Sequence, residues 1–377
     1  MTARAPSLPP GVTPAELGYR MPAEWEPHAA TWIAWPHFRD DWPGKFQPIP
    51  WVYAEIVRHL AQRETVEIIV NNAQAEGGAR KLLKSAGVEP GAGVRFHHWP
   101  TDRVWTRDYG PIFLRKASSP RTWTPDSPGE HPLVATAWRF NAWAKYPNWR
   151  NDAAIAVRIA QSQDIPVVQP TLDLSGRKYR LVLEGGSIDV NGWGTLLTTE
   201  ECLLSPVQAR NPRVSREQLE KVFADCLGIS KVLWLGSGIV GDDTHGHVDD
   251  LARFAGPDAL VAAVEREPTD ANFAPLQENL RRLRSMTDQD GKPLRVVELP
   301  MPGAVVFQGR RLPASYANFY IANGLVLVPV FNDKNDRRAL NILAEVFSDR
   351  EVVGIYCGDL IWGFGAIHCM TQQQPAA

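Results

Sequence analysis

The chain has 377 residues, 44% hydrophobic and 22% charged, which is typical of a globular protein and excludes a disordered or fibrous chain. Its 40 Lys and Arg residues nearly balance its 42 Asp and Glu residues, so the net charge of −2 argues against a nucleic-acid partner. The longest apolar run, residues 324–331, is far shorter than the roughly 20 residues that cross a bilayer, which excludes membrane insertion.

Short strands and helices alternate along the predicted chain. Residues 1–20 contain four prolines and few large apolar side chains, which predicts a flexible lead-in. Helical spacing of apolar residues predicts helices over residues 50–63, 73–86, 151–161, 215–226, 270–284 and 336–347. Short apolar runs predict strands over residues 65–70, 94–98, 112–114, 180–183, 195–197, 232–235, 260–264 and 325–331. This pattern indicates an α/β fold, with a surface loop over residues 116–132.

The cysteines and the N-terminus favour a reducing environment. The four cysteines include no CxxC pair and are too few for a disulfide framework in a chain of this length. The N-terminal residues lack the apolar segment of a secretion signal. We therefore expect a cytoplasmic protein.

Tryptophan is unusually frequent. The chain has 14 tryptophans, most of them between Trp25 and Trp149. Such residues favour a core or interface rich in large aromatic rings. The alternative is an aromatic-walled pocket, in which ring faces hold an apolar stem or a cation.

Two carboxylates stand beside turn glycines. Asp108 comes just before Gly110 and Pro111, and Glu184 follows the apolar run at residues 180–183 and precedes two glycines. Backbone hydrogen bonding in a turn is a sufficient explanation for Asp108, and an exposed sheet edge is one for Glu184. The functional alternative in both cases is a carboxylate that faces a cleft.

A third segment, residues 242–250, is dense in titratable groups. If its backbone is extended, His245, His247 and Asp249 point to one face. Such a cluster suits acid–base catalysis, or a metal site of the kind found in hydrolases. A solvated acidic turn is the remaining interpretation.

A fourth segment places Cys369 after a glycine-containing turn near the C-terminus. A free cysteine is usually an inert, buried residue. Its neighbour His368 points the opposite way in an extended chain, so the remote His247 is the expected partner. A cysteine with a histidine and several carboxylates is the set of groups that activates a thiolate nucleophile.

The carboxylates also indicate the substrate. Asp108, Glu184 and Asp249 are hydrogen-bond acceptors, whereas a cysteine hydrolase of amides needs donors for its oxyanion. A planar guanidinium, with five N–H donors, matches carboxylates best. We therefore expect Cys369 to attack a guanidinium carbon, with His247 protonating the departing ammonia and later activating water.

Six stretches in order resemble the agmatine deiminase family, within the bacterial peptidylarginine-deiminase-like proteins of the guanidino-group-modifying superfamily. They include Trp105-x-Arg-Asp108-x-Gly-Pro, Glu184-Gly-Gly-Ser and Ile-His-Cys369. The full set covers residues 21–28 with 31–36, 105–111, 184–187, 191–202, 246–250 and 367–375.

The resemblance implies a fold and an activity. The fold is a five-bladed, pseudo-symmetric α/β propeller (a pentein) of ββαβ-type modules, here a single domain over residues 21–377. The activity is hydrolysis of agmatine to N-carbamoylputrescine and ammonia, a step of polyamine biosynthesis, through a covalent S-alkylthiouronium intermediate. It needs no metal or cofactor. The implied partners are a small cationic guanidino substrate and further copies of the chain, in a homodimer or higher oligomer.

The resemblance also implies roles for particular residues. Cys369 is the nucleophile and His247 the general acid and base. Asp108 and Asp249 bind the guanidinium, and Glu184 contacts the histidine or the guanidinium.

Some positions depart from the family pattern. Phe364 and Ala366 stand where the family commonly has Gly and Asn, which changes the pocket beside Cys369. Arg103, close to Trp105, adds a cation that would repel an amine and favour a carboxylate. We therefore expect Trp105, Arg103 and Phe364 to contact the substrate.

These departures keep other functions open. Within the class, the alternative substrate is arginine or peptidyl arginine. The alternatives from other classes are a metallohydrolase that uses His245, His247 and Asp249, and a non-catalytic binding protein. His245 itself stands where the family more often has an acidic or amide residue.

Overall fold

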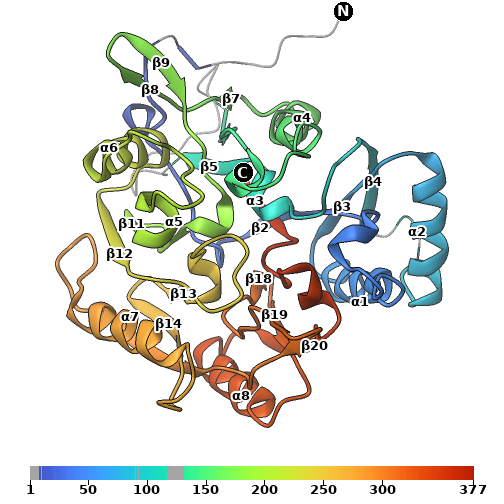
Figure 1. Ribbon diagram of the computed structural model, residues 1–377. Helices are drawn as coiled ribbons and strands as arrows, with labels where there is room; N and C mark the ends of the chain where they lie inside the picture. The colour runs from blue at the N-terminus through green and yellow to red at the C-terminus, as the bar shows by residue number, and fades with distance from the viewer. Residues whose placement is uncertain (1–7, 10, 90, 92, 117–130) are drawn as a thin grey trace, which may run out of the picture.

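The computed structural model describes residues 8–9, 11–89, 91, 93–116 and 131–377. The strands of these residues lie in small separate sheets, and most helices lie toward the outside of the molecule (Figure 1). Five of the sheets repeat one pattern, in which an antiparallel pair of strands is followed by a parallel neighbour. Because parallel neighbours need a crossover connection, a helix stands between them in the chain.

The first of these five sheets joins the two ends of the chain. Its order is β21 (Gln372–Pro375), β2 (His28–Ala34), β3 (Thr65–Val70) and β4 (Val94–His98). Strand β21 runs antiparallel to β2, and the crossovers are α1 (Ile49–Leu60) and α2 (Ala73–Ser85). The C-terminal segment that carries Cys369 is therefore held against the first long strand.

The other four sheets follow in chain order. The second has the order β1 (Tyr19–Arg20), β5 (Ile112–Lys116), β6 (Leu133–Thr136) and β7 (Val167–Val168), with α4 (Ile155–Ser162) as its crossover. The third contains β10 (Asp189–Val190), β11 (Thr195–Thr199) and β12 (Lys231–Leu235), with α5 (Glu200–Leu204) and α6 (Arg216–Leu227).

The fourth sheet contains β13 (Ala252–Gly256), β14 (Ala259–Val264) and β15 (Arg295–Pro300), with α7 (Phe273–Ser285). The fifth contains β18 (Tyr320–Ala322), β19 (Leu325–Val330) and β20 (Glu351–Tyr356), with α8 (Asp336–Val346).

Two hairpins and one short helix lie outside these five sheets. The hairpins are β8 (Thr171–Leu174) with β9 (Arg177–Arg180), and β16 (Val306–Phe307) with β17 (Arg310–Arg311). Helix α3 (Thr106–Tyr109) lies near the middle of the molecule (Figure 1).

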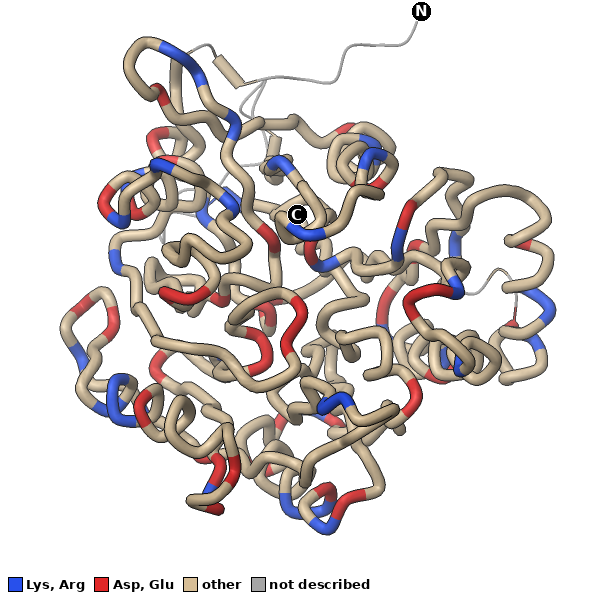
Figure 2. Tube along the Cα trace, viewed as in Figure 1, with Lys and Arg blue, Asp and Glu red and all other residues tan. Residues whose placement is uncertain are grey.

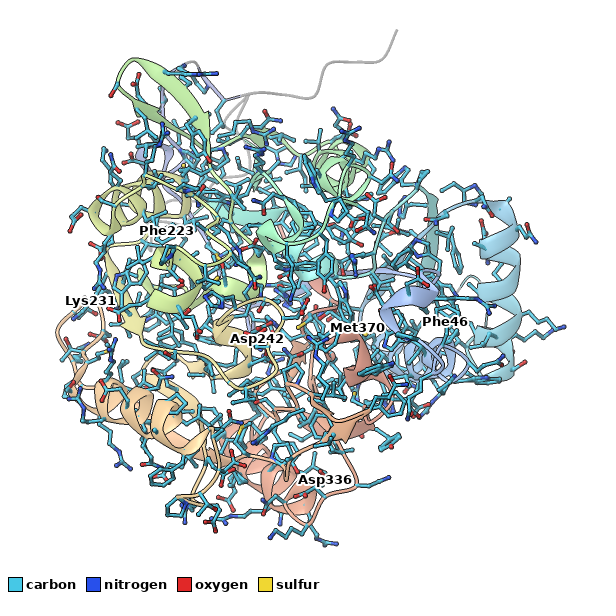
Figure 3. All side chains as sticks on the ribbon, in the orientation of Figure 1. Phe46, Phe223, Lys231, Asp242, Asp336 and Met370 are labelled. Carbon is cyan, nitrogen blue, oxygen red and sulfur yellow. The ribbon has the colours of Figure 1, made fainter. Side chains whose placement is uncertain are left out.

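The central strands explain where the core lies. Every residue of β14 is buried, and so is all of β19 except Val330. Such continuous apolar runs are expected of strands covered on both faces. Figure 3 shows Asp242 and Met370 near the middle of the molecule, whereas Lys231 and Asp336 lie toward its edge.

The surface is electrically mixed. Figure 2 shows Lys and Arg interspersed with Asp and Glu along the outer helices. In the part of the chain that the structure describes, no helix is long and apolar enough to cross a membrane.

The sequence predicted most of these elements. The helices expected at residues 215–226 and 336–347 are confirmed as α6 and α8, and Ser215 forms a capping box with Gln218 at the start of α6. The strands expected at residues 65–70, 94–98 and 260–264 are confirmed as β3, β4 and β14. The expected loop over residues 116–132 lies mostly outside the described residues.

Two expectations need correction. The strand expected at residues 180–183 is wrong, because β9 ends at Arg180 and the backbone of Val182 bonds instead to the side-chain amide of Asn211, at 2.9 and 2.7 Å. The lead-in is shorter than expected, because the buried Tyr19 and its neighbour Arg20 pair with β5.

Candidate active site

The expected nucleophile faces a cavity. Cys369 lies between a 3-10 turn, η7 (Leu360–Gly363), and strand β21, and lines a cavity of about 360 Å³. Its Sγ accepts a hydrogen bond from Asn318 Nδ2 at 3.1 Å and lies 3.7 Å from Asp249 Oδ2. Burial, together with nearby carboxylates, raises the pKa of the Cys369 thiol well above its ordinary value. The thiol is therefore neutral at pH 7 unless a positive charge comes close.

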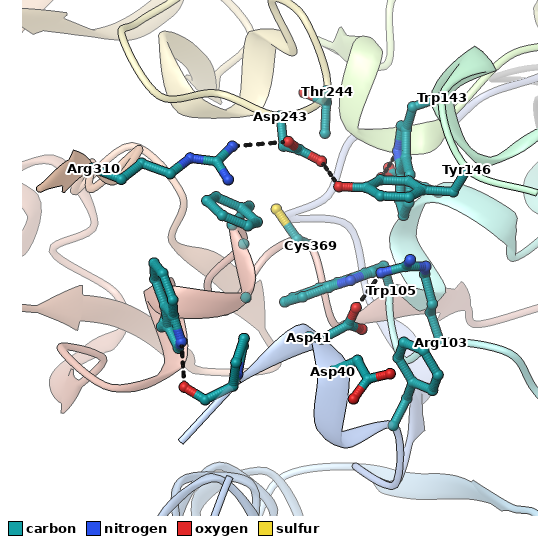
Figure 4. Close-up of a pocket in the computed structure, with 17 residues that line it drawn as sticks. Asp40, Asp41, Arg103, Trp105, Trp143, Tyr146, Asp243, Thr244, Arg310 and Cys369 are labelled. Carbon is teal, nitrogen blue, oxygen red and sulfur yellow. Dashed lines mark hydrogen bonds and ion pairs between the residues drawn. The ribbon is translucent and has the colours of Figure 1, made fainter. Parts of the chain in front are cut away.

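Aromatic rings form much of the cavity wall. Figure 4 shows Trp105, Trp143 and Tyr146 around the Cys369 sulfur. Three further rings line the cavity, from Phe38, Trp362 and Phe364. Other tryptophans, such as Trp32 and Trp42, are fully buried in the core. Some tryptophans thus belong to an aromatic-rich core, and others form the wall of a pocket.

Asp108 shares the cavity with Cys369. It lies on α3, and its carboxylate accepts hydrogen bonds from Trp143 Nε1 at 2.8 Å and from the Gly186 amide at 3.1 Å. Burial raises the pKa of Asp108 to about 6, with Asp249 and Glu184 adding to the rise. Asp108 is thus held in place by two hydrogen bonds, and burial outweighs the opposing effect of His247 on its pKa.

His247 lies behind Asp108, between two carboxylates. Its Nδ1 is 3.8 Å from Asp108 Oδ1, and its Nε2 is 3.9 Å from Glu184 Oε2. Among the described residues, neither ring nitrogen has a hydrogen-bond partner. Burial alone would lower the pKa of His247, but Asp108 and the other acidic neighbours raise it well above its ordinary value. The acidic neighbours of His247 therefore favour the protonated form of the ring.

The Glu184 carboxylate is held by a buried arginine. Arg210 Nε donates to Glu184 Oε1 at 3.1 Å, and both side chains are fully buried. Although burial opposes ionisation, Arg210 lowers the pKa of Glu184 to about 2. Glu184 therefore stays charged and contacts the histidine rather than the cavity, because it does not line the cavity wall.

Gly186 lies at the point where these groups meet. A Cβ atom at this position would lie 2.6 Å from His247 Nδ1, 2.9 Å from Asp108 Oδ1 and 3.0 Å from Asp249 Oδ2. The second glycine of the Glu-Gly-Gly stretch is therefore required by packing, since only a hydrogen side chain leaves room for three reactive side chains.

Asp249 begins a second buried chain of contacts. His368 Nδ1 lies 2.7 Å from Asp249 Oδ2, and His368 Nε2 lies 2.8 Å from Glu24 Oε2. Arg253 completes the chain at 2.9 Å from Glu24. Despite the opposing effect of burial, the hydrogen bond from His368 lowers the pKa of Asp249. The extended backbone on which the expected opposite directions of His368 and Cys369 depended is wrong, because residues 367–370 form a turn. Both side chains approach the same Asp249 oxygen, the His368 ring at 2.7 Å and the Cys369 sulfur at 3.7 Å.

The expected side-by-side arrangement of His245, His247 and Asp249 is wrong. His245 has a φ of +64°, and Val248–Asp250 form a 3-10 turn instead of an extended segment. The His245 ring turns away, with Nε2 3.2 Å from Ser205 Oγ. These three side chains therefore do not converge on one metal ion.

A different set of groups does come close together. One potential ligand atom each from Glu184, Cys202 and His247 lies within 4.8 Å of the others. Such nitrogen, oxygen and sulfur atoms are ligands that zinc accepts. However, Arg210 beside Glu184 already supplies positive charge at this point.

The residues expected to contact the substrate all line the cavity. Arg103 donates to Asp41 and stacks on Tyr146, with its guanidinium carbon 4.1 Å from the ring centroid. The positive charge of Arg103 is therefore balanced by the carboxylate of Asp41, which also lines the cavity. Trp105 lines another part of the wall.

Phe364 has an unusual backbone. Its φ is +67°, a region that bulky residues rarely adopt. It lies between Gly363 and Gly365, where added Cβ atoms would approach Trp42 and Trp105 to 2.7 and 2.6 Å. Such strain is typical of functional sites.

The sequence analysis missed several side chains of this region. Asn318 bridges Cys369 and Asp250, with its Nδ2 3.0 Å from Asp250 Oδ1. Arg210 holds Glu184, and Arg310 lies at the cavity wall. None belongs to a stretch with a reactive pattern, so nothing local in the sequence identifies them.

Known proteins match the chain over nearly its whole length. A family model described as Porphyromonas-type peptidyl-arginine deiminase matches residues 20–375. The agmatine deiminases of Medicago truncatula and Ectopseudomonas mendocina are each 35% identical and match 97% of this chain, over 98% and 97% of their own lengths.

Solved structures agree with these matches. The agmatine deiminase of Enterococcus faecalis superposes with a TM-score of 0.85 at 32% identity, covering 98% of this chain and 99% of that one. A substrate-bound agmatine deiminase of C. jejuni superposes with a TM-score of 0.79 at 25% identity, covering 94% and 96%. The chain therefore belongs to the Porphyromonas-type peptidyl-arginine deiminase family, that of the agmatine deiminases.

Proposed function

We propose that this protein hydrolyses a small guanidino compound, with agmatine as the first candidate, and that Cys369 is the nucleophile. The observation that carries the proposal is the pairing of a cysteine with carboxylates on one aromatic cavity. Cys369 and Asp108 both line it, and Asp249 Oδ2 lies 3.7 Å from the sulfur. A guanidinium between two carboxylates presents its carbon to the thiolate.

The chemistry has two halves. The Cys369 thiolate forms an S–C bond to the guanidinium carbon, His247 gives a proton to one terminal nitrogen, and that C–N bond breaks to release ammonia. The S-alkylthiouronium remains on the enzyme. His247, now neutral, takes a proton from water, and the resulting hydroxide adds to the same carbon. The S–C bond then breaks and the proton of the new hydroxyl group passes to solvent, which leaves the urea product and the thiolate.

The electrostatics suit this order of events. The neutral thiol and the imidazolium are the states favoured before substrate binds. A guanidinium cation beside Cys369 and Asp108 would offset the carboxylates that raise the thiol pKa. A bound guanidinium thus favours loss of the Cys369 thiol proton to solvent, which leaves the thiolate that attacks the guanidinium carbon. His247 already holds the separate proton that the departing ammonia needs.

We expect the reaction to lose efficiency in acid. Asp108 binds the guanidinium only as a carboxylate, and its raised pKa of about 6 means that it becomes protonated earlier than an ordinary aspartate. The kcat/KM for agmatine should therefore fall about tenfold per pH unit below that value. A pH profile between 4.5 and 8 checks this, and a flat profile down to pH 5 would contradict it.

The repeated sheets support a further structural proposal. We infer that the five sheets with the common strand pattern form the blades of an α/β propeller, in one domain, with the site at its centre. The cytoplasmic location, the absence of any need for a metal or cofactor, and a homodimer or higher oligomer remain predictions of the sequence.

Ammonia release tests the proposed function. The purified protein is given agmatine, arginine or a blocked peptidyl arginine, with and without EDTA. We expect turnover of agmatine that EDTA leaves unchanged. Silence on all three substrates would contradict the proposal, and loss of turnover with EDTA would favour a metallohydrolase.

A further inference from the structure

We propose that Arg310 is a second binding group at the cavity, which receives a carboxylate or carbonyl oxygen at the far end of a guanidino substrate. The inference rests on the proposed function, because the guanidine end is placed at Cys369. It extends the substrate class from guanidines that end in an amine to guanidino acids and amides.

The hairpin that carries Arg310 is anchored. Gln308 and Gly309, with φ of 51° and 74°, form the two-residue turn between β16 and β17, and such primed turns suit the twist of the strands. Arg311 Nη1 donates to Asp270 Oδ1 at 2.8 Å. Phe307 packs edge-on against Trp362 at 4.5 Å between ring centroids. Arg310 therefore starts from a fixed backbone position.

The Arg310 guanidinium is held in place by two contacts, and within the described residues most of its N–H donors remain free to bind a ligand. Its central carbon lies 3.9 Å from the centroid of the Phe364 ring, and one Nη donates to Asp243 Oδ1 at 3.2 Å. A guanidinium has five N–H donors, and the others make no hydrogen bond with the residues that the structure describes. The side chain is 51% exposed, so these donors are accessible to a ligand.

Asp243 can share Arg310 with a ligand. Lys145 Nζ lies 2.6 Å from its carboxylate, and the Tyr146 hydroxyl donates to it at 2.5 Å. These two contacts are shorter than the one to Arg310. Asp243 would therefore keep its charge compensated if Arg310 turned partly toward a substrate oxygen (Figure 4).

Arg103 is less accessible than Arg310 to a substrate carboxylate or carbonyl oxygen. Its side chain is only 10% exposed, and its guanidinium is enclosed by Tyr146 and Phe38 and paired with Asp41. The carboxylate-binding role suggested for Arg103 by the sequence thus suits Arg310 better.

The cavity offers the opposite charge on its other side. The carboxylate of Asp40 is exposed and makes no hydrogen bond or ion pair with the described part of the chain. Figure 4 shows Asp40 and Arg310 on opposite sides of the Cys369 sulfur. A substrate ammonium, as in agmatine, would therefore turn toward Asp40, and a substrate carboxylate toward Arg310.

Three substrates of equal chain length separate these roles: agmatine, 4-guanidinobutyrate and 1-butylguanidine. The wild-type protein should hydrolyse 4-guanidinobutyrate. Arg310→Gln should lower kcat/KM for that substrate about tenfold more than for 1-butylguanidine, through KM, because it removes a charge-assisted hydrogen bond. Asp40→Asn should raise KM for agmatine by a similar factor relative to 1-butylguanidine.

The controls separate failure of the inference from failure of the proposed function. Arg311→Gln, on the same hairpin but turned toward Asp270, should leave the ratio between the substrates unchanged, and Arg310→Lys should restore part of it. Equal losses on all substrates in Arg310→Gln, or hydrolysis of 1-butylguanidine without 4-guanidinobutyrate, would overturn the inference. Turnover of none of the three would contradict the proposed function itself.

Discussion

Cys369→Ala is expected to lower ammonia release from agmatine by roughly a thousandfold or more, because the proposed covalent intermediate forms on the Cys369 sulfur. The protein should stay folded, since the change removes little more than the contacts of the sulfur with Asn318 and Asp249. The measurement is kcat by an ammonia assay, together with mass spectrometry of the wild-type protein stopped during turnover. That spectrum should show a covalent adduct on Cys369.

A second cysteine gives the matched control. Cys226 lies on α6, in a separate buried cluster that contains no cavity residue. Cys226→Ala should therefore keep wild-type turnover. Full activity in Cys369→Ala, or an adduct on another cysteine, would rule out the proposed nucleophile.

Gly186→Ala is expected to lower kcat/KM by about a hundredfold or more, since displacement of reacting groups by about 1 Å has effects of this size. The new methyl group would lie 3.0 Å or closer to His247, Asp108 and Asp249, and at least one of them must move. We expect KM to rise and kcat to fall, because in the proposed mechanism Asp108 binds the guanidinium and His247 transfers protons. Steady-state kinetics with agmatine measures both.

A glycine in a helix is the matched control for Gly186. A Cβ at Gly77, on α2, meets nothing within 4 Å. Gly77→Ala should keep activity and raise stability by about 0.5–1 kcal/mol, because alanine favours helices. If Gly186→Ala were as active as Gly77→Ala, the convergence of the three side chains at this glycine would have no catalytic importance.

The proposed nucleophile and its partners could be predicted because they carry reactive side chains beside turns. Asp108, Glu184, His247, Asp249 and Cys369 all came from short stretches rich in glycine or in titratable groups. The structure brings them close together, with Asp108 and Cys369 on the cavity wall and Glu184, His247 and Asp249 packed outside it. It also gives the local geometry that the sequence left open, namely a 3-10 turn at Val248–Asp250 that directs His245 away from His247.

The sequence by itself determined the α/β class, most helices and strands, and the candidate site residues, because these depend on apolar periodicity and on side-chain chemistry within a few residues. Only the tertiary structure shows which other polar residues contact and position these candidate site residues. Asn318 meets Cys369 across 51 positions of the chain, and Arg310 meets Asp243 across 67. Contacts of this kind join segments that are far apart in the chain, and no local pattern in the sequence records them.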